Sequence, residues 1–396
     1  MANLFDELQN GTVSRRKLFE LFPIAAGSAA LVSAQAGKQT KQTKAGAQGS
    51  PAAPPKMSPA NIGGGGRIER DYYREWIKTS KVPMLDGYSL LDASKQEVQP
   101  WPDTGGRGLY LNFSGNVHMD AVINEIPAGK ALEQKRHFYE QIVYVLGGRG
   151  YTTIGGGAAN SAANKVEWAE GSLFSIPMNA LHRHFNSDSA HPARLLMITT
   201  FPLMLQMFGS MGLINDLNFN FNDRYSGAPG YFSSTQRVRQ RWDKTNFVKD
   251  IRSSEVVEWK ERGNGNASMF WEMAGNTILE PHMSEFDVGS YKAGHRHPYE
   301  AIILTLNGRG FSLAEKDDLK DSGATKIDWQ AGSLVSPPFY WWHQHFNTGN
   351  TKARYLAITE GDFPIRLGFP LQVEQIELDK EDPEIKKHFD RELHRL

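Results

Sequence analysis

The chain contains one module twice, and this duplication constrains its fold more than any other feature. The segment HFYEQIVYVLGGRG at 137–150 returns as HPYEAIILTLNGRG at 297–310, an offset of 160 residues (297 − 137 = 160). Three more pairs follow in the same order: GSLFSIP at 171–177 with GSLVSPP at 332–338, HRHFN at 182–186 with HQHFN at 343–347, and ARLLMIT at 193–199 with ARYLAIT at 353–359. So many ordered matches at nearly one spacing indicate two copies of a domain.

Each copy is predicted to consist of short β-strands. The repeated runs are rich in β-branched and aromatic residues and are bounded by Gly or Pro, which is typical of strands and turns. The expected strands are Gln141–Leu146, Ser172–Ile176 and Arg194–Thr200 in copy one, and Ala301–Leu306, Ser333–Ser336 and Arg354–Thr359 in copy two. Helical periodicity is largely confined to Asp379–Leu396, whose many charges indicate a solvated face or a contact with a partner subunit.

Composition excludes several classes of function. The chain has 396 residues, enough for two domains and tails, and its 44 Lys and Arg balance its 44 Asp and Glu. This charge balance offers no basic face for nucleic acid. The sequence contains no cysteine. Disulfides, thiolate catalysis and cysteine-ligated zinc or iron–sulfur sites are therefore excluded.

The N-terminal segment resembles a twin-arginine signal peptide. A basic stretch at 14–17 contains Arg15 and Arg16, an apolar run follows at 18–32, and Ala34-Gln35-Ala36 offers a cleavage site. We therefore expect residues 1–36 to direct export to the periplasm or cell exterior. The apolar run is too short to anchor the chain, so no membrane association is expected after cleavage. Residues 37–66 have almost no large apolar side chains and predict a disordered linker.

The histidines of both copies stand in motifs that resemble those of the cupin superfamily. Copy two reads G-x5-HRH at 289–297 and G-x5-P-x-Y-x2-H-x3-N at 332–347. Copy one reads G-x5-P-x-N-x2-H-x3-N at 171–186. The resemblance implies a double-stranded β-helix, or jelly roll, in each copy. We therefore expect an all-β chain with two tandem cupin domains, at 67–225 and 226–375, and a short charged helical tail at 376–396.

Three histidines of copy two are the predicted metal ligands. His295 and His297 are two residues apart, so in a strand they point to the same face. His343 lies on another strand that can bring its ring to theirs. Three imidazoles leave open positions on a divalent metal, as catalysis at a metal requires.

The fourth ligand of the family is missing from this pattern. Ala301 stands where the resemblance places a glutamate, and Gln141 takes that position in copy one. Glu140 and Glu300 are one residue away and are expected to face the other side of their strands. A slipped register that brings Glu300 to the metal remains open. Without a carboxylate the metal keeps its full double-positive charge, which favours an anionic, chelating substrate or dioxygen.

Two features of copy two resemble gentisate dioxygenase-like bicupins. They are the His-Arg-His motif followed by Ala301 and the aromatic run YWWHQH at 340–345. The resemblance implies Fe(II), a small hydroxy-acid or diol bound through two oxygens, and ring or carbon–carbon cleavage by dioxygen. Two alternatives remain: a lyase, isomerase or decarboxylase that uses Mn, Ni or Zn, and a non-catalytic bicupin that binds a small molecule. The resemblance also implies a homo-oligomer.

His345 is the predicted catalytic residue beside the metal. It lies two residues from His343 and therefore shares the inward face. It could orient the ligands or give a proton to bound oxygen, and a purely structural buried histidine is the alternative. Tyr299 and Trp341 are further candidates for the pocket wall or the core.

Copy one departs from the motif at its first histidine. Lys135 stands there, so Lys135, His137, Gln141 and His182 form a degenerate second site, with His184 as a further candidate. An ammonium group is a poor ligand unless burial removes its proton. Either this copy holds a metal in a distorted site, or the lysine cation takes the metal's place and the domain is structural.

Overall fold

The computed structural model describes residues 70–113, 116–155, 163–263, 265–370 and 372–394. The predicted signal peptide (1–36) and linker (37–66) lie outside these residues. Within the described part of the chain, no helix combines the length and apolar character needed to cross a membrane.

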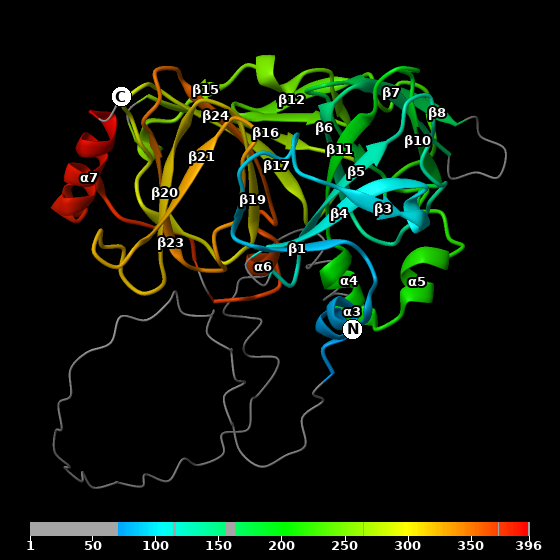
Figure 1. Ribbon diagram of the computed structural model, residues 1–396, viewed down its shortest axis with the longest axis horizontal. Coiled ribbons are helices and arrows are strands. Elements are labelled where there is room, and N and C mark those ends of the chain that lie inside the picture. Colours follow the sequence, from blue (N-terminus) through cyan, green and yellow to red (C-terminus); the bar gives the residue numbers. More distant parts are fainter. Residues whose placement is uncertain (1–69, 114–115, 156–162, 264, 371, 395–396) are drawn as a thin grey trace, which may run out of the picture. The chain divides into compact units, whose positions relative to one another are not determined.

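Copy one consists of a large and a small β-sheet (Figure 1). The large sheet has the strand order β1-β4-β5-β11-β6-β9-β14, with β3 paired to β4, and the small sheet has the order β10-β7-β8. The bounds are β1 Met84–Gly87, β3 Gln99–Trp101, β4 Gly106–Phe113, β5 Asp120–Ile126, β6 Gln141–Gly147, β7 Arg149–Ile154, β8 Asn164–Ala169, β9 Leu173–Ile176, β10 His182–Asn186, β11 Ala193–Thr199 and β14 Phe247–Val248.

Copy two repeats this arrangement. Its large sheet has the order β12-β13-β16-β17-β24-β19-β22-β2, with β15 on β16, and its small sheet has the order β21-β20-β23-β18-β25. The bounds are β2 Ser89–Leu90, β12 Thr235–Arg239, β13 Trp242–Thr245, β15 Val257–Glu258, β16 Asn266–Glu272, β17 Glu280–Phe286, β18 His295–Arg296, β19 Ala301–Asn307, β20 Arg309–Glu315, β21 Thr325–Gln330, β22 Leu334–Val335, β23 Trp342–Asn347, β24 Ala353–Thr359 and β25 Glu374–Gln375.

The predicted all-β class is confirmed, and each expected strand occurs within two residues of its predicted bounds. The C-terminal helix is also confirmed as α7, Pro383–Leu393. Its buried Ile385 and Phe389 pack against Phe311 and Phe346 of copy two, so this charged helix has an apolar stripe at i, i+4 spacing.

Short helices between the strands were not expected from the sequence. They are α3 Tyr72–Thr79, α4 Phe201–Phe208, α5 Met211–Asp216 and α6 Phe363–Arg366, with 3-10 turns at Pro102–Thr104, Ile251–Ser253, Lys260–Arg262 and Leu378–Lys380. The segment of α4, FPLMLQMF, has Gln206 as its only polar residue, so no pattern of polar and apolar residues marks it as a helix in the sequence. Its Phe201 ring packs edge-on against Trp76 of α3, with ring centroids 4.8 Å apart.

The Gly-Arg-Gly turns after β6 and β19 require glycine at one position in each copy. Gly148 and Gly308 have φ of +85° and +87°, in the left-handed region. A Cβ at either position would stand 2.7 Å from the Cα of Ala193 or Ala353. Both conformation and space therefore exclude a larger residue here.

The long apolar strands β6 and β19 are buried on both faces. Ile142 and Tyr144 of β6 join Ile302 and Leu304 of β19 in a core that the two large sheets share. The alternate residues, such as Val143 in copy one, pack instead inside their own copy. Because side chains alternate along a strand, Gln141 and Ala301 face the interior of their own copies. Glu140 and Glu300 face the junction, which is the region where the large sheets of the two copies pack together.

The two copies exchange a short strand. Ser89 and Leu90, which follow β1 of copy one in the chain, pair with β22 of copy two. In return Phe247 and Val248, which follow β13 of copy two, pair with β9 of copy one. Each large sheet is therefore completed by residues that precede the other copy's repeated segment.

Buried carboxylates tie the copies together in the same reciprocal way. Glu140 of copy one accepts hydrogen bonds from the backbone N–H groups of Thr277, Ile278 and Leu279 in copy two, at 2.7–2.9 Å. Arg224 adds an ion pair at 2.9 Å. Three amides and a guanidinium thus replace the water that the Glu140 carboxylate loses on burial.

Glu300 of copy two mirrors this contact without the arginine. Its carboxylate accepts hydrogen bonds from the backbone N–H groups of Val117, His118 and Met119 in copy one. The neighbouring acid is Glu360, which pairs with the His118 imidazole at 2.9 Å and accepts the backbone N–H of Glu300. Burial, together with the charge of Glu360, raises the pKa of Glu300.

The difference between these two contacts predicts unequal effects of one substitution. Glu140→Gln should lower the free energy of unfolding by about 1–3 kcal/mol, because it leaves the half-buried Arg224 without its anion. Glu300→Gln should cost less, because it also removes an acid beside Glu360. Urea unfolding of both variants measures this, with the surface change Glu97→Gln as the control. A larger loss for Glu300→Gln would contradict the assignment of Arg224 as the decisive partner.

Candidate metal centre

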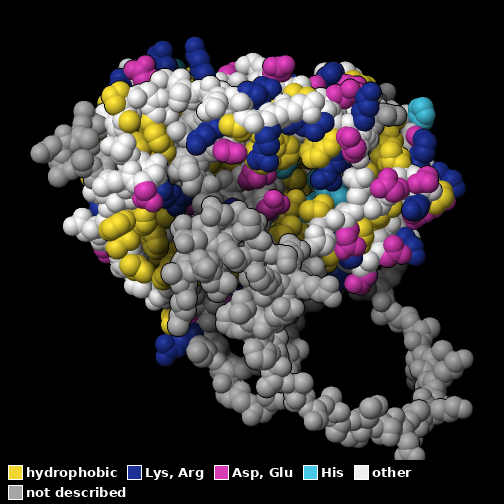
Figure 2. All heavy atoms as spheres, turned by 180° about the vertical axis from the view of Figure 1, so that it is seen from behind, with side chains coloured by type: hydrophobic (Ala, Val, Ile, Leu, Met, Phe, Trp, Pro, Cys, Tyr) yellow, Lys and Arg dark blue, Asp and Glu magenta, His cyan; other side chains and the backbone are white. Residues whose placement is uncertain are grey.

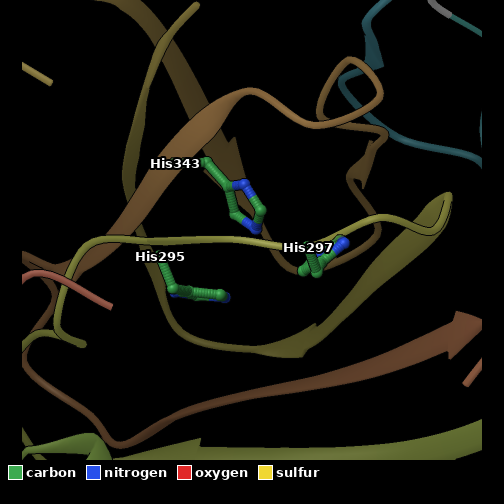
Figure 3. Close-up of side chains that lie close together, drawn as sticks. All are labelled: His295, His297 and His343. Carbon is green, nitrogen blue, oxygen red and sulfur yellow. The ribbon is translucent and has the colours of Figure 1, made fainter. Parts of the chain in front are cut away.

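The structure brings His295, His297 and His343 together. His295 lies on β18 and pairs in register with His343 on β23, and His297 follows two residues after His295. Figure 3 shows the first two on one strand segment and His343 on its neighbour, with the rings close together. Ring centroids are 4.4 Å apart for His295 and His343 and 4.8 Å for His297 and His343. One nitrogen from each ring lies within 4.8 Å of the others.

Backbone carbonyls fix which nitrogen each imidazole presents. The Nδ1 of His295 lies 3.0 Å from the Ala293 oxygen, that of His297 2.8 Å from the Tyr299 oxygen, and that of His343 2.9 Å from the Trp341 oxygen. A carbonyl only accepts, so each Nδ1 carries the proton and each neutral ring has its lone pair on Nε2. This outer hydrogen bond is what orients a metal-ligating imidazole.

The three rings are also held neutral. Burial lowers the pKa of His295 and His297 well below 6.5, and the neighbouring imidazoles lower it further. Burial lowers the pKa of His343 to about 4. Three buried neutral imidazoles with fixed Nε2 lone pairs fit a divalent metal of the nitrogen-binding type.

Among the described residues, no carboxylate belongs to this group of potential ligands. Ala301 lines the cavity beside the histidines, as the sequence register predicted. The oxygens of Glu300 bind the amides of copy one, so Glu300 is not available as a ligand here. Glu300, His118 and Glu360 also have potential ligand atoms within 4.8 Å of one another, but amides and an ion pair already occupy them.

His345 lies in the same cavity and is hydrogen-bonded on its outer side. Its Nδ1 is 2.7 Å from the hydroxyl of Ser312, which also accepts the indole N–H of Trp329. Its ring centroid lies 5.6 Å from that of His343. In copy one, His184, Thr152 and Trp168 form the equivalent hydrogen-bond network. The repeated network positions the imidazole in both copies.

The aromatic candidates have separate positions. Tyr299 stacks on His297 with ring centroids 3.9 Å apart and lines the cavity. Trp341 contributes its carbonyl to His343. Tyr340 adopts a left-handed φ of 59°, at the position where the cupin motif has glycine. Its hydroxyl donates to Glu374, which also binds Arg296 between the two histidines.

The cavity above the histidines has a volume of about 440 Å³ and contains cations that the sequence did not indicate. Lys292 is 5% exposed and donates to the hydroxyls of Ser284 and Tyr355 at 2.8 and 2.6 Å. No carboxylate pairs with it among the described residues. Arg262 also lines the cavity, and it packs over the Trp259 ring. A buried cation without an acidic partner favours an anion in the cavity.

The first copy has apolar or small residues in place of these cations. In copy two the backbone N–H of Ala293 donates a hydrogen bond to the carbonyl of Arg262, and in copy one the N–H of Glu133 donates to the carbonyl of Thr104. Leu132 therefore occupies the position of Lys292, and Thr104 that of Arg262. Since copy one folds without the two cations, the fold itself does not require them.

Glu280 is another cavity residue that the sequence did not indicate. It begins β17, and burial together with the charge of Asp362 raises its pKa to about 7. Asp120 holds the same place in copy one, where burial raises its pKa to about 7. A carboxyl with this pKa can exchange protons near neutral pH.

Copy one brings its four predicted residues into a separate cavity, also of about 440 Å³: Lys135, His137, Gln141 and His182. The Nδ1 of His137 lies 3.1 Å from the Tyr139 oxygen, and that of His182 lies 3.0 Å from the Ala180 oxygen. These two imidazoles therefore have the tautomer of their counterparts in copy two. Only the third ring is missing, and the Lys135 side chain takes its place.

Comparisons with known proteins agree with this architecture. The family model described as "Cupin domain" matches residues 122–199. The match covers copy one only. Copy two repeats the strands of copy one, so the chain has a bicupin-like fold. No curated protein matched the chain.

Solved structures with a similar chain path include two enzymes. A variant of salicylate 1,2-dioxygenase from Pseudoaminobacter salicylatoxidans is 15% identical, with 68% of this chain and 81% of that chain covered and a TM-score of 0.48. A variant of oxalate decarboxylase from Bacillus subtilis is 14% identical, with 84% and 93% covered and a TM-score of 0.48. Likeness at this level does not indicate the activity of this chain.

The matching tautomers predict that one substitution creates a second metal site. Lys135→His should restore the third imidazole and raise bound divalent metal by about one equivalent per chain over the wild type. Elemental analysis after reloading the EDTA-treated protein measures this. The control is Lys130→His on the exposed surface of the same copy. An unchanged metal content would show that the first cavity does not bring three rings to one point.

The buried histidines predict that stability falls in acid. Burial lowers the pKa of eight: His137, His182, His184, His282, His295, His297, His343 and His345. Below pH 6.5 the unfolded chain binds more protons than the folded chain, so each group costs about 1.4 kcal/mol per pH unit down to its folded pKa.

We therefore expect the free energy of unfolding of the metal-free protein to fall between pH 6.5 and 5. Asp120 and Glu280 act in the opposite sense, because their raised pKa removes stability as the pH rises through about 7. Urea unfolding across pH 5–8 should thus show a maximum between about 6.5 and 7. His282→Phe should reduce the acid slope, and a profile flat from pH 5 to 7 would contradict the burial of these rings.

Proposed function

We propose that this bicupin is a non-heme Fe(II) dioxygenase that acts on a small chelating hydroxy-acid or diol. The observation that carries the proposal is the copy-two site, where three neutral imidazoles present Nε2 lone pairs and Ala301 stands in place of a carboxylate. This donor set leaves the metal's charge uncompensated and positions open for substrate and dioxygen.

Bound Fe(II) would supply dioxygen activation and attachment points for two substrate oxygens. The chain's own residues supply the rest. His295, His297 and His343 would hold the ion, and their carbonyl partners keep the three rings from turning. Figure 2 shows both signs of charge interspersed on one face of the molecule. The formal net charge of the chain is zero as well. The proposed selection of an anion therefore rests on the residues of the cavity.

The cavity wall supports an anionic substrate. Lys292 and Arg262 place two cations beside the histidines, and the described residues contain no acid paired with either. A carboxylate or phenolate in the cavity would offset the cost of burying the Lys292 ammonium. The cavity volume of about 440 Å³ suits a small molecule. His345, fixed by Ser312, is positioned to donate a hydrogen bond to such a ligand.

A second candidate function is a lyase, isomerase or decarboxylase with Mn, Ni or Zn at the same site. Glu280 favours it, since this cavity carboxyl has a pKa of about 7 and could move a proton without any oxidant. The two candidates share the metal ligands and differ in whether dioxygen is consumed.

Replacement of one ligand tests the site. His297→Ala should reduce bound metal from about one equivalent per chain to near zero and abolish turnover, while the thermal unfolding transition of the metal-free protein changes little. Elemental analysis and circular dichroism measure both effects. His191→Ala, on the exposed surface, is the control. A His297→Ala protein that kept metal and turnover would refute the site.

Oxygen dependence separates the two candidate reactions. Oxygen uptake should accompany turnover of a panel of hydroxybenzoates, catechols and 2-hydroxy acids by Fe(II)-loaded protein. Turnover under strict anaerobiosis would refute the dioxygenase and support the lyase-type reaction.

We further propose that the protein acts in the periplasm or outside the cell as a homo-oligomer. Export is supported by the Arg15-Arg16 segment, which lies outside the described residues. The oligomer is supported only by the resemblance to bicupins.

A further inference from the structure

The cavity of copy one contains several polar groups without partners. His137 Nε2, His184 Nε2 and the side-chain nitrogen of Gln141 are buried and lack a hydrogen-bond partner among the described residues. All three residues line the cavity. A buried polar atom left unpaired costs about 1–3 kcal/mol, so three in one cavity indicate a ligand that pairs with them.

Lys135 adds a cation to the same cavity. Lys135 lines the cavity and remains exposed. The protein around it lowers the pKa of its amine, while Asp103 and Glu133 act in the opposite sense. No carboxylate lies within ion-pair distance of the amine in the described part of the chain. The backbone of Lys135 pairs with that of His182, as the backbone of His295 pairs with that of His343 in copy two. Lys135 is therefore the counterpart of His295.

The polarity of these groups defines the ligand. Lys135 and the Gln141 amide nitrogen are donors, so they require an acceptor that is preferably anionic. His137 carries its proton on Nδ1, so its Nε2 is an acceptor and requires a donor. A carboxylate bound at Lys135 and Gln141, with a hydroxyl group that donates to His137, pairs with two of the three unpartnered atoms and with the amine.

The remaining walls limit the charge and shape of the ligand. Asp103 and Glu133 line the cavity and disfavour a second negative charge. Trp76, Trp101 and Tyr139 also line it and offer aromatic surface to an apolar remainder. We infer that copy one is a second binding site, independent of the metal centre, for a small monocarboxylic acid that carries a hydroxyl group.

Three matched probes test this site in the full-length, EDTA-treated protein. Mandelate has the carboxylate, the hydroxyl and a ring, phenylacetate lacks the hydroxyl, and benzyl alcohol lacks the carboxylate. Isothermal titration calorimetry should detect mandelate binding, with each of the other two weaker by about tenfold or more. His137→Phe should remove the preference for mandelate over phenylacetate.

Variants of the two cavities locate the binding. Lys135→Met should weaken mandelate at least about tenfold, whereas Lys135→Arg, which keeps the charge, should retain most of the affinity. Lys130→Met, on the exposed surface of copy one, is the matched control and should leave mandelate binding unchanged. Lys292→Met reports separately on any binding in the cavity of copy two. Thermal unfolding by circular dichroism checks that each variant is folded.

Three outcomes would overturn the inference. One is the absence of binding by any of the three probes. A second is a loss of mandelate binding in Lys292→Met but not in Lys135→Met, which would place the ligand in copy two. The third is a second equivalent of divalent metal in reloaded wild-type protein that disappears in Lys135→Met, which would make copy one a metal site instead.

Discussion

Glu140 and Glu300 are buried carboxylates that accept three backbone N–H groups each from the opposite copy. These contacts determine more than the attachment of two domains. In a strand, neighbouring side chains point to opposite faces, so a carboxylate held at the junction forces the next residue toward the interior of its own copy. Gln141 and Ala301 therefore face their cavities. The absence of a carboxylate at the metal centre follows from the same contact, because Glu300 is engaged elsewhere.

From a common scaffold the two cavities have diverged through a few residues. Both orient their histidines with backbone carbonyls, and both contain a carboxyl with a raised pKa, Asp120 or Glu280. The difference is the place of the positive charge. Copy one has Lys135 where a ligand would stand, whereas copy two keeps its third imidazole and has Lys292 and Arg262 in the wall. Each cavity contains a cation, and among the described residues three imidazoles gather as potential metal ligands in copy two.

The repeat made the all-β fold, the strands and the grouping of three histidines predictable, since each follows from local pattern and spacing. The position of Glu300 followed from strand alternation, but its partners did not, because the amides of 117–119 belong to the other copy. Lys292 could have been found by aligning the two copies, because the equivalent residue of copy one, 160 positions earlier, is Leu132. Arg262 is harder to find, because its segment shows no repeated motif. The exchanged strands β2 and β14 are two residues long and carry no detectable pattern.

The exchange of β2 and β14 has a consequence for the order in which the protein is made. Ser333 of copy two bonds to Leu91 across 242 residues of chain. The large sheet of copy two lacks its edge strand unless the earlier-made β2 pairs with it, and the large sheet of copy one lacks its edge strand until β14 has emerged. Such distant pairings are slow to form, and the strands left at the edge can meet the edges of other chains in the meantime. The two copies should therefore mature together after synthesis, and each copy expressed alone would lack one edge strand of its large sheet.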